Sequence, residues 1–513
     1  MHNQKTTLKH PSDTVTRVEV MSDIENNAAN RDLRFVIIGA GMAGILSAIK
    51  LREAGYDDIV IYEKADRLGG TWRDNTYPGL TCDVPSHSYT YSFEPNPEWT
   101  RYLPPGQEVQ GYFEGIADKY KVCEITRFGQ EVTSCVFDRG AWHLETKSGL
   151  TDRADFVIAA TGVLHHPSYP NIEGLDDFQG ALFHSSRWDH SVPLAGKRVG
   201  IIGNGSTGVQ IVSALVGVAS KVSHFQRTAQ WIMKVENGIY TDEQKAAFRG
   251  DPALLYRMQN DETYIANVKR FTDAIKDADS AEIKMIEAAV LENLETSVTD
   301  SALKEKLRPT YRAACKRLIY SPDYYEKIQD PGAELVTDKI LRVEADGVRT
   351  ADGRLHALDV LALATGFRAD QFMRPMNVVG RGGIRLNDVW VRRPNAYLAV
   401  SIPEFPNLFM VNGPTGPVGN FSLIDIAERQ VAYIVQLIEL VRSGKCREVS
   451  VTQAAMDAYE VRRIKAAKGT IFASGCRSWY LDAEGVPASW PWSYDDFARA
   501  MSAPELEAFD LAA

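Results

Sequence analysis

Short apolar runs alternate with glycine-bearing turns and helix-like stretches in the first part of the chain. Residues 35–38 are all apolar and lead into glycines, then into a helix-like stretch that reaches Leu51, and then into a second apolar run within 58–63. Apolar runs of this length are typical of buried strands, and the order strand, turn, helix, strand is typical of a parallel sheet. The pattern therefore predicts a first α/β unit from residue 34 onward.

The same pattern returns in the middle of the chain, where a strand at 197–203 is followed by a helix near 209–218 and a strand at 221–226. The two copies lie too far apart for a solenoid repeat, so we expect one nucleotide-binding domain inserted in another. Between 242 and 317, charged residues alternate with apolar ones at helical spacing and glycine is rare, which predicts an inserted helical subdomain. Three further elements are expected: strands near 334–336 and 360–363, and a long helix near 426–442.

Composition is that of an ordinary globular protein, since 44% of the 513 residues are hydrophobic and 24% are charged. This length is too great for one core and predicts two or three domains. The net charge of −10 argues against a binder of nucleic acid or anionic membrane, because both need a basic surface. No apolar run approaches the roughly 18–20 residues of a membrane span. The polar N-terminal residues resemble a loose tail and not a signal peptide, so we expect a cytoplasmic protein.

The six cysteines are scattered, and none stands in a C-x-x-C pair. Zinc ribbons and redox-active dithiols both need such pairs, so neither is favoured and no metal site is expected. Buried, reduced thiols are the expectation for all six, which are Cys82, Cys123, Cys135, Cys315, Cys446 and Cys476.

The first glycine turn reads GAGMAG and lies between the first predicted strand and its helix. In the dinucleotide fingerprint Gly39 permits the tight turn, Gly41 lets the backbone approach a pyrophosphate, and Gly44 lets the helix pack on the strand. The pyrophosphate then meets the free N–H groups at the helix N-terminus. Glu63 ends the second strand, where a carboxylate can accept from a ribose hydroxyl.

The second glycine turn reads GNGSTG and has the same spacing and context. It supplies five candidate nucleotide-binding residues, namely Gly203, Gly205, Ser206, Thr207 and Gly208. Its second strand ends in Arg227 and Thr228, where an NAD-binding protein would place an acid. A guanidinium can bind a 2′-phosphate that an acid would repel, so NADPH is favoured over NADH. The alternative is that Arg227 is a solvated charge at the end of a strand.

Three further segments favour FAD as the ligand of the first turn. Residues 68–72 read LGGTW, which offers Gly70, Thr71 and Trp72 as a second approach of backbone to the cofactor. The small-residue turns at 159–162 (AATG) and 364–366 (ATG) each follow a predicted strand and can close beside a nucleotide. Each signal is weak alone, but together they outline a flavoprotein that binds two nucleotides.

We therefore expect an α/β fold with two Rossmann-like domains, one for FAD and one for NADP, and an inserted helical subdomain. The expected boundaries are a disordered tail at 1–32, the FAD-binding domain at 33–175 and 369–513, the NADP-binding domain at 176–235 and 315–368, and the helical insertion at 236–314. The last part of the FAD-binding domain includes a C-terminal active-site segment.

Residues 178–189 read FQGALFHSSRWD, which fits the signature F-x-G-x-x-x-H-x-x-x-W-(P/D). The chain therefore resembles the type I Baeyer–Villiger monooxygenases, which are class B flavin monooxygenases, over nearly its whole length. Relatives that oxidise amines and sulfides usually carry Tyr or Phe at the last aromatic position, so Trp188 and Asp189 favour Baeyer–Villiger chemistry. From the residues alone His184 and Trp188 would more often be a packed linker pair. The resemblance implies that the signature, including Phe178 and Gly180, controls movement of the NADP domain.

Two segments carry the mechanism that the resemblance implies. Residues 77–83 read YPGLTCD, similar to a family stretch near the flavin ring, and residues 315–318 read CKRL, similar to its K-R segment. The resemblance implies that Arg317 is the active-site arginine, that Asp83 is its carboxylate partner and also a cofactor-binding residue, and that Lys316 helps hold the 2′-phosphate. A buried anion needs a cation that keeps its proton, and a carboxylate orients that cation. From sequence alone Asp83 and Arg317 would be a loop acid and a helix-end base.

The C-terminal segment both matches the family and departs from it. Residues 478–480 (SWY) match the place where a family tryptophan meets bound NADP, which implies that Trp479 binds the cofactor. Residues 481–485 read LDAEG and lack the common continuation G-A-N-x-P-G-K. The closure of a mobile loop at this place is therefore in doubt.

The implied reaction uses NADPH, O2 and a ketone. NADPH reduces the flavin, O2 adds to form a C4a-peroxide that Arg317 and retained NADP+ stabilise, and attack on the ketone gives an ester or lactone. Oxidation of a sulfide or amine by a related flavin monooxygenase is the alternative. A disulfide reductase would need a cysteine pair beside the flavin, where Cys82 stands alone, and a redox-sensing binding protein would show no ketone-stimulated NADPH consumption. The particular ketone and the oligomeric state stay open.

Overall fold

Two five-stranded parallel sheets organise the molecule. The computed structural model describes residues 33–512 except 418–421, 477 and 479. In this part, every neighbouring pair within the two sheets is parallel. The first sheet has the order β19 (Leu408–Met410), β7 (Phe156–Ala159), β1 (Phe35–Ile38), β2 (Ile59–Tyr62), β3 (Thr126–Arg127). The second has the order β13 (Ala333–Val336), β10 (Lys221–Phe225), β9 (Arg198–Ile202), β17 (Val360–Leu363), β8 (Ala181–His184).

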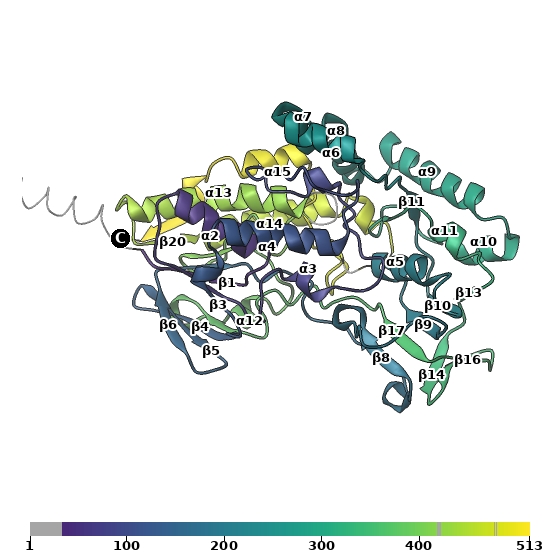
Figure 1. Cartoon of the computed structure of the whole chain (residues 1–513). Helices are drawn as coiled ribbons and strands as arrows, with labels where there is room; N and C mark the ends of the chain where they lie inside the picture. Colours follow the sequence, from purple (N-terminus) through teal and green to yellow (C-terminus); the bar gives the residue numbers. More distant parts are fainter. Residues whose placement is uncertain (1–32, 418–421, 477, 479, 513) are drawn as a thin grey trace, which may run out of the picture.

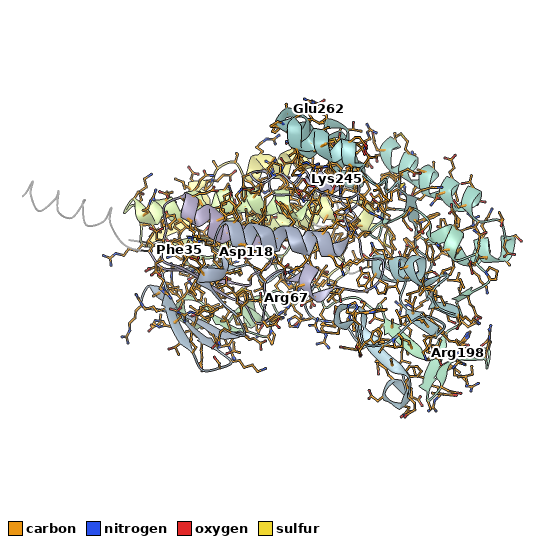
Figure 2. All side chains as sticks on the ribbon, viewed as in Figure 1. Phe35, Arg67, Asp118, Arg198, Lys245 and Glu262 are labelled. Carbon is orange, nitrogen blue, oxygen red and sulfur yellow. A yellow bond between two sulfur atoms is a disulfide. The ribbon has the colours of Figure 1, made fainter. Side chains whose placement is uncertain are left out.

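The apolar runs form the central strands because these strands are covered on both faces. All four residues of β1, β2, β7 and β17 are buried, and a strand covered on both sides is apolar throughout. Phe35 and Arg198, which begin the central strands β1 and β9, lie well apart at the left and lower right of the view (Figure 2). The sheets are thus the centres of two units, and the expected α/β fold with two Rossmann-like units is confirmed.

A helix follows each glycine turn. Helix α2 (Met42–Glu53) connects β1 to β2, and α5 (Ser206–Leu215) connects β9 to β10. Helix α2 is apolar on most sides and packs against α13 (Leu423–Arg442), the long helix expected near 426–442. The remaining helices of these units are α3 (Thr71–Asp74), α4 (Gly106–Lys119), α11 (Tyr324–Lys327), α12 (Leu386–Val389), α14 (Gln453–Ala467) and α15 (Tyr494–Ala500).

The charged and apolar region after residue 241 forms five helices, which lie at the top and right of Figure 1. Each begins after a side chain whose oxygen accepts from a backbone N–H of the first turn, which offsets the unpaired donors of a helix start. These capping residues are Thr241, Asp251, Asp261, Ser280 and Asp300. The helices are α6 (Asp242–Gly250), α7 (Pro252–Gln259), α8 (Glu262–Lys276), α9 (Ala281–Ser297) and α10 (Ser301–Leu307).

Several smaller sheets complete the fold, and the sequence pattern did not predict them. A four-stranded sheet packs beside the first unit, with the order β18 (Asn377–Val379), β4 (Val132–Asp138), β5 (Ala141–Thr146), β6 (Thr151–Ala154). A meander of β14 (Ile340–Glu344), β15 (Gly347–Thr350) and β16 (Leu355–Ala357) belongs to the second. Two pairs remain, β11 (Ile232–Lys234) with β12 (Ile319–Ser321), and β20 (Glu448–Val451) with β21 (Phe509–Ala512). None of the helices described is both long and apolar enough to cross a membrane.

Candidate active site

The first glycine turn has the backbone geometry that its sequence predicts. Gly39 has φ +104°, and a Cβ there would lie 2.6 Å from the carbonyl oxygen of Ala160, in the AATG turn that follows β7. A Cβ on Gly44 would lie 1.9 Å from the carbonyl oxygen of Gly39. Only glycine fits at these two positions, because one needs a positive φ and the other a close approach of helix to strand. The Cα of Gly70 lies 3.6 Å from the Cβ position of Gly41, so the LGGTW turn meets the first turn as expected.

The second turn repeats this arrangement in the second sheet. Gly203 has φ +110°, and a Cβ there would lie 2.3 Å from the carbonyl oxygen of Ala364, in the ATG turn that follows β17. A Cβ on Gly208 would lie 2.0 Å from the carbonyl oxygen of Gly203. Gly205 faces open space instead. The two small-residue turns thus pack against the two glycine turns, as the sequence indicated.

Both helix N-termini that follow the glycine turns are suited to an anion. Helix α2 begins after Gly41 and α5 after Gly205, and neither start has a side-chain cap or an acid in its first turn. The first N–H groups of each helix therefore keep their hydrogen-bonding capacity, and the helix dipole adds a partial positive charge. This fits two pyrophosphate groups, one at each turn.

Glu63 lies at the end of β2, where the fingerprint requires an acid. One carboxylate oxygen accepts from the backbone N–H of Ala40 at 2.8 Å, and the other accepts from Arg73 at 3.0 Å. Both side chains of the Glu63–Arg73 pair are less than a tenth exposed. Arg73 follows the predicted Thr71 and Trp72 on α3 and was missed, although an arginine directly after an LGGTW turn is a visible signal. Its charge offsets the cost of burying the carboxylate of Glu63.

Two cations lie together at the end of the second unit's β10. Burial and the nearby charge of Arg227 lower the pKa of Lys316, and both residues line the same cleft. Among the ion pairs of the described residues neither has a carboxylate partner, and the Nζ of Lys316 lies over the ring of Tyr311 at 4.3 Å. Two cations without an acid between them fit a phosphate. Thr228 lies beside them, and its carbonyl accepts from Asn204 at 2.7 Å.

Arg317 and Asp83 are in contact although 234 positions separate them. The Arg317 Nη2 and Nε donate to one oxygen of Asp83 at 2.5 and 3.1 Å. Their side chains are 28% and 23% exposed, so both reach the cleft. Burial acts to lower the pKa of Arg317, but the carboxylate of Asp83 outweighs it and raises the pKa above its ordinary value. The guanidinium also lies near Tyr480, where its charge opposes the rise in the tyrosine's pKa that burial causes. The site therefore holds a fixed positive charge.

The YPGLTCD segment connects the two units beside this pair. The Tyr77 hydroxyl donates to the side chain of Gln210 on α5 at 2.9 Å and accepts from Thr207 at 3.3 Å. Gly79 has φ +80°, and a Cβ there would lie 2.5 Å from the carbonyl oxygen of Gln210. Burial raises the pKa of the adjacent Cys82 thiol. The segment thus holds Asp83 at the junction of the two units.

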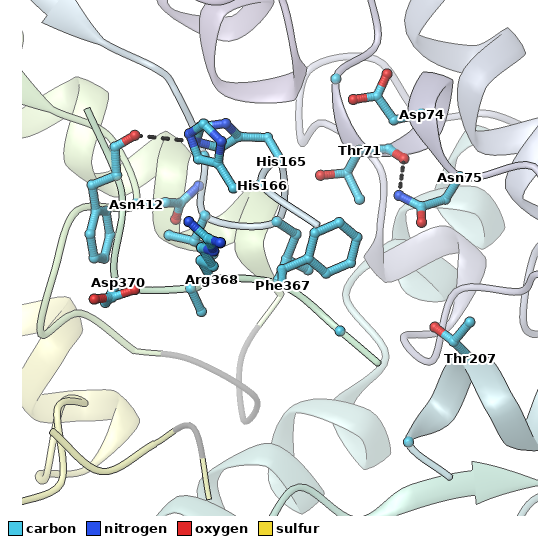
Figure 3. A pocket seen from close by; sticks show the side chains of 18 of the residues that line it. Thr71, Asp74, Asn75, His165, His166, Thr207, Phe367, Arg368, Asp370 and Asn412 are labelled. Atoms are coloured by element: carbon cyan, nitrogen blue, oxygen red, sulfur yellow. Dashed lines mark hydrogen bonds between the residues drawn. The ribbon is translucent and has the colours of Figure 1, made fainter. Parts of the chain in front are cut away.

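One cleft of about 1650 Å³ contains these features. Figure 3 shows Thr71 and Asn75 of the first unit at the upper right, Thr207 of the second unit below them, and His165 and His166 across the view at the upper left. Both histidines accompany the AATG turn and were missed, although their place just after a strand end is a signal. Burial lowers the pKa of His165 to about 4. The predicted residues that line the cleft are Gly39, Gly41, Glu63, Gly70, Thr71, Trp72, Asp83, Gly203, Gly205, Ser206, Thr207, Arg227, Thr228, Lys316 and Arg317.

The signature residues lie outside the cleft, on the edge strand β8 and the turn after it. His184 accepts from the backbone N–H of Ser186 at its Nδ1, so its Nε2 carries the proton and donates to the carbonyl of Gly366 at 3.1 Å. Trp188 packs edge-on against Phe183 at 4.7 Å. Asp189 is exposed and accepts from Ser191. Phe178 and Gly180 precede β8, and a Cβ on Gly180 would lie 2.4 Å from the carbonyl of Asp359. The signature thus fastens β8 to the turn after β17.

The C-terminal segment is anchored by residues that differ from the family's usual continuation. Trp479 lies outside the described residues. Beyond it, Asp482 and Glu484 pair with Arg393 at 2.5 and 3.2 Å, and the buried Arg463 donates to the carbonyl of Pro487 at 2.7 Å. These contacts hold residues 481–488 against the cleft.

The expectation of six reduced thiols is wrong for two of them, because Cys315 and Cys476 form a disulfide. The pair is 161 positions apart, so no short spacing announces it. Cys82, Cys135 and Cys446 are free and buried as expected, whereas Cys123 is free but partly exposed, so the expectation of burial is wrong for it. The disulfide is outside the cleft lining and thus does not provide the cysteine pair that a disulfide reductase needs beside its flavin.

Taken together, two parallel sheets, two glycine turns and one shared cleft define a two-nucleotide oxidoreductase. The profile of the family described as pyridine nucleotide-disulphide oxidoreductase matches residues 36–241. An uncharacterised monooxygenase of Mycobacterium tuberculosis is 46% identical over 93% of this chain and 95% of its own. A Baeyer–Villiger monooxygenase of Pseudomonas aeruginosa is 33% identical over 92% of this chain and 89% of its own.

Solved structures of monooxygenases also resemble this chain over nearly its whole length. The structure of cyclohexanone monooxygenase from Rhodococcus sp. Phi1 bound to NADP+ has a TM-score of 0.83 and 30% identity, and the match covers 94% of this chain and 99% of that one. The complex of OTEMO with FAD and NADP has a TM-score of 0.84 and 25% identity, with the same coverage. The chain belongs to the type I Baeyer–Villiger monooxygenases, a family of class B flavoprotein monooxygenases, and the resemblance drawn from its motifs is confirmed.

Proposed function

We propose that this chain uses FAD, NADPH and O2 to insert one oxygen atom next to a ketone carbonyl, which gives an ester or lactone. The observation that carries the proposal is the Arg317–Asp83 contact in the wall of the cleft that both glycine turns share. Bound FAD supplies the redox chemistry, since it takes electrons from NADPH and passes them to dioxygen. We also propose that NADP+ stays bound while oxygen is activated and that Arg317 and NADP+ together stabilise the activated oxygen.

Two groups of residues would hold the cofactors. The uncapped start of α2 and the carboxylate of Glu63 suit the pyrophosphate and ribose of FAD, and the start of α5 suits the pyrophosphate of NADP. Trp479 stays a prediction for NADP, and so do the domain boundaries. For FAD we propose Gly39, Gly41, Gly44, Glu63, Gly70, Thr71, Trp72 and Asp83. For NADP we propose Gly203, Gly205, Ser206, Thr207, Gly208, Arg227, Thr228 and Lys316.

Arg317 would act by charge and not by proton transfer. Asp83 holds the pKa of Arg317 above its ordinary value, so the guanidinium keeps its proton at every working pH. A fixed cation stabilises negative charge that develops where oxygen is reduced, and it does so most strongly in a site with little water. Asp83 orients the guanidinium and offsets the cost of burying it.

The signature would transmit changes in the second unit without touching the reacting atoms. His184 bonds the turn at Gly366, which packs beside the second glycine turn through Ala364. A shift of this turn on nucleotide binding would therefore move the edge strand β8 and Trp188. We propose that the signature has this conformational role.

The glycines of the second turn give the first prediction. We expect Gly205→Ala to leave the thermal stability unchanged within about 0.5 kcal/mol, since its Cβ faces open space, yet to weaken NADP+ binding because a methyl enters the pyrophosphate site. Gly208→Ala should instead lower stability by about 1–3 kcal/mol, because its Cβ meets the Gly203 carbonyl. Thermal unfolding and NADP+ titration check both variants. Equal NADP+ affinity of Gly205→Ala and the unaltered chain would contradict the site.

Two test substrates distinguish ketone oxidation from the alternative, which is oxidation of a sulfide or amine. With a cyclic ketone and a thioether of similar size, we expect ester formation to account for the NADPH consumed with the ketone. Ketone oxidation needs an anionic oxidant, which a fixed cation favours, whereas soft nucleophiles react with the protonated form. Chromatography of both products against NADPH consumed is the measurement. Sulfoxide alone, with no ester from a panel of linear, cyclic and aryl ketones, would favour the heteroatom oxygenase.

A further inference from the structure

The disulfide joins the segment that carries Arg317 to the C-terminal segment. Cys315 stands two positions before Arg317, and Cys476 stands four positions before Tyr480. Their Cα atoms are 6.2 Å apart, and the residues are 0% and 6% exposed. The disulfide thus joins two segments whose cysteines are 161 positions apart in the sequence. It lies next to the site, since neither cysteine lines the cleft.

Tyr480 is the residue through which the C-terminal segment reaches Arg317. Its hydroxyl lies close to the guanidinium that donates to Asp83, and both Tyr480 and Arg317 line the same cleft. The ring is 3% exposed, packs against Phe472 at 4.9 Å, and shares a cluster with Ala314. Arg317 therefore has one partner in the first unit and another in the C-terminal segment.

The backbone before Arg317 also depends on its surroundings. Ala314 is buried and has φ +61°, a left-handed conformation that is unfavourable for a residue with a Cβ. Such a conformation persists only where neighbouring contacts determine it. The next residue is Cys315, and its bond to Cys476 is a covalent contact of this kind.

The C-terminal segment is anchored separately at its far end. Asp482 pairs with Arg393, and the carbonyl of Pro487 accepts from Arg463. Tyr480 lies between these anchors and the disulfide. Loss of the disulfide would therefore release the end of the segment that holds Tyr480, while the far end stays in place.

We propose that the Cys315–Cys476 disulfide is a clamp that positions Arg317, because it holds Tyr480 against the guanidinium. Its formation removes one proton and one electron from each thiol and joins the two sulfurs. Hydrogen peroxide can accept the electrons and become two waters, or a low-molecular-weight disulfide can accept them and become two thiols. A buried disulfide exchanges slowly, so the clamp is stable once formed. The effect on oxygenation rests on the role of Arg317 proposed above.

The test compares three variants of the full, cofactor-loaded protein. Cys476→Ser breaks the clamp, Tyr480→Phe removes only the hydroxyl, and Cys446→Ser changes a buried free cysteine elsewhere.

Alkylation under denaturing conditions before reduction should leave Cys315 and Cys476 unmodified and joined in one peptide pair. Hydrogen exchange at residues 480 and 481 should quicken in Cys476→Ser, while exchange over the anchored residues 482–488 stays unchanged, and Cys446→Ser should change neither. The ester formed per NADPH should fall about tenfold in Cys476→Ser and in Tyr480→Phe, as expected for one lost hydrogen bond, with flavin reduction unaltered.

Several results would overturn the clamp. Full alkylation of Cys315 and Cys476 in the unreduced protein would show that the disulfide does not form. Exchange at residues 480 and 481 and an ester yield at the unaltered level in Cys476→Ser would show that the disulfide does not position Tyr480. A normal ester yield in Tyr480→Phe would show that the hydroxyl does not act on Arg317. Hydrogen exchange needs no turnover, so it reports on the clamp even if Arg317→Ala still forms ester and the proposed function fails.

Discussion

Arg317→Ala should lower ester formation by about 10²–10³-fold, the effect of removing one donor that stabilises a developing negative charge. The variant should still bind FAD, and NADPH should still reduce the flavin, because the glycine turns and the two cations of the proposed NADP site do not depend on this side chain. NADPH consumption should then continue without ester. Arg317→Lys should retain part of the activity, since an ammonium keeps the charge but loses the planar fork that Asp83 holds. Anaerobic flavin reduction and product analysis separate the two steps.

Arg312→Ala is the matched control. Arg312 lies five positions earlier in the same segment and pairs with Glu287 at 2.8 Å, outside the cleft lining. Its loss should change stability by less than about 1 kcal/mol and leave the ester yield intact. Substantial lactone or ester from Arg317→Ala would refute the assigned role. Failure of this variant to bind FAD would mean that Arg317 maintains the fold of the cleft and not its charge.

The parallel sheets were predictable because their signals are local. A fully apolar run followed by glycines at 39, 41 and 44 identifies a strand, a turn and a helix without any long-range information. The small sheet of β4, β5 and β6 was missed although β4 alternates buried and exposed residues. Its short antiparallel strands bury one face only, and their alternating pattern is a weaker signal than the unbroken apolar runs of the two parallel sheets.

The active site was predictable only in part because its contacts are not local. Asp83 and Arg317 are ordinary residues in the sequence, and the family resemblance alone indicated that they meet. The hydroxyl of Tyr480 and the disulfide at Cys315 carry no signal at all, since neither a lone tyrosine nor two cysteines 161 positions apart follow a spacing rule. Arg73, by contrast, could have been found from its place after the LGGTW turn.

Arg227→Ala should raise the KM for NADPH by roughly 10–150-fold, equivalent to about 1.5–3 kcal/mol for a charge-assisted hydrogen bond. The KM for NADH should change little, because NADH has no 2′-phosphate for the guanidinium to bind. Arg227 is exposed, and its charge helps to lower the pKa of Lys316, so the two cations share one site. Lys316→Ala should act in the same direction, and the double variant should lose less than the sum of the two, because both side chains would contact one phosphate in the proposed site. Steady-state kinetics with both coenzymes measures the effect.

The control for coenzyme choice is Arg198→Ala. Arg198 begins β9 in the same sheet, pairs with Asp359 at 2.7 Å, and is labelled at the lower right of Figure 2. The C-terminal ends of parallel strands carry the nucleotide site, whereas Arg198 stands at the opposite end of its strand. Its replacement should leave the ratio of the two KM values unchanged. If Arg227→Ala raises both KM values equally, the guanidinium is a solvated charge at a strand end and Lys316 alone must select the 2′-phosphate.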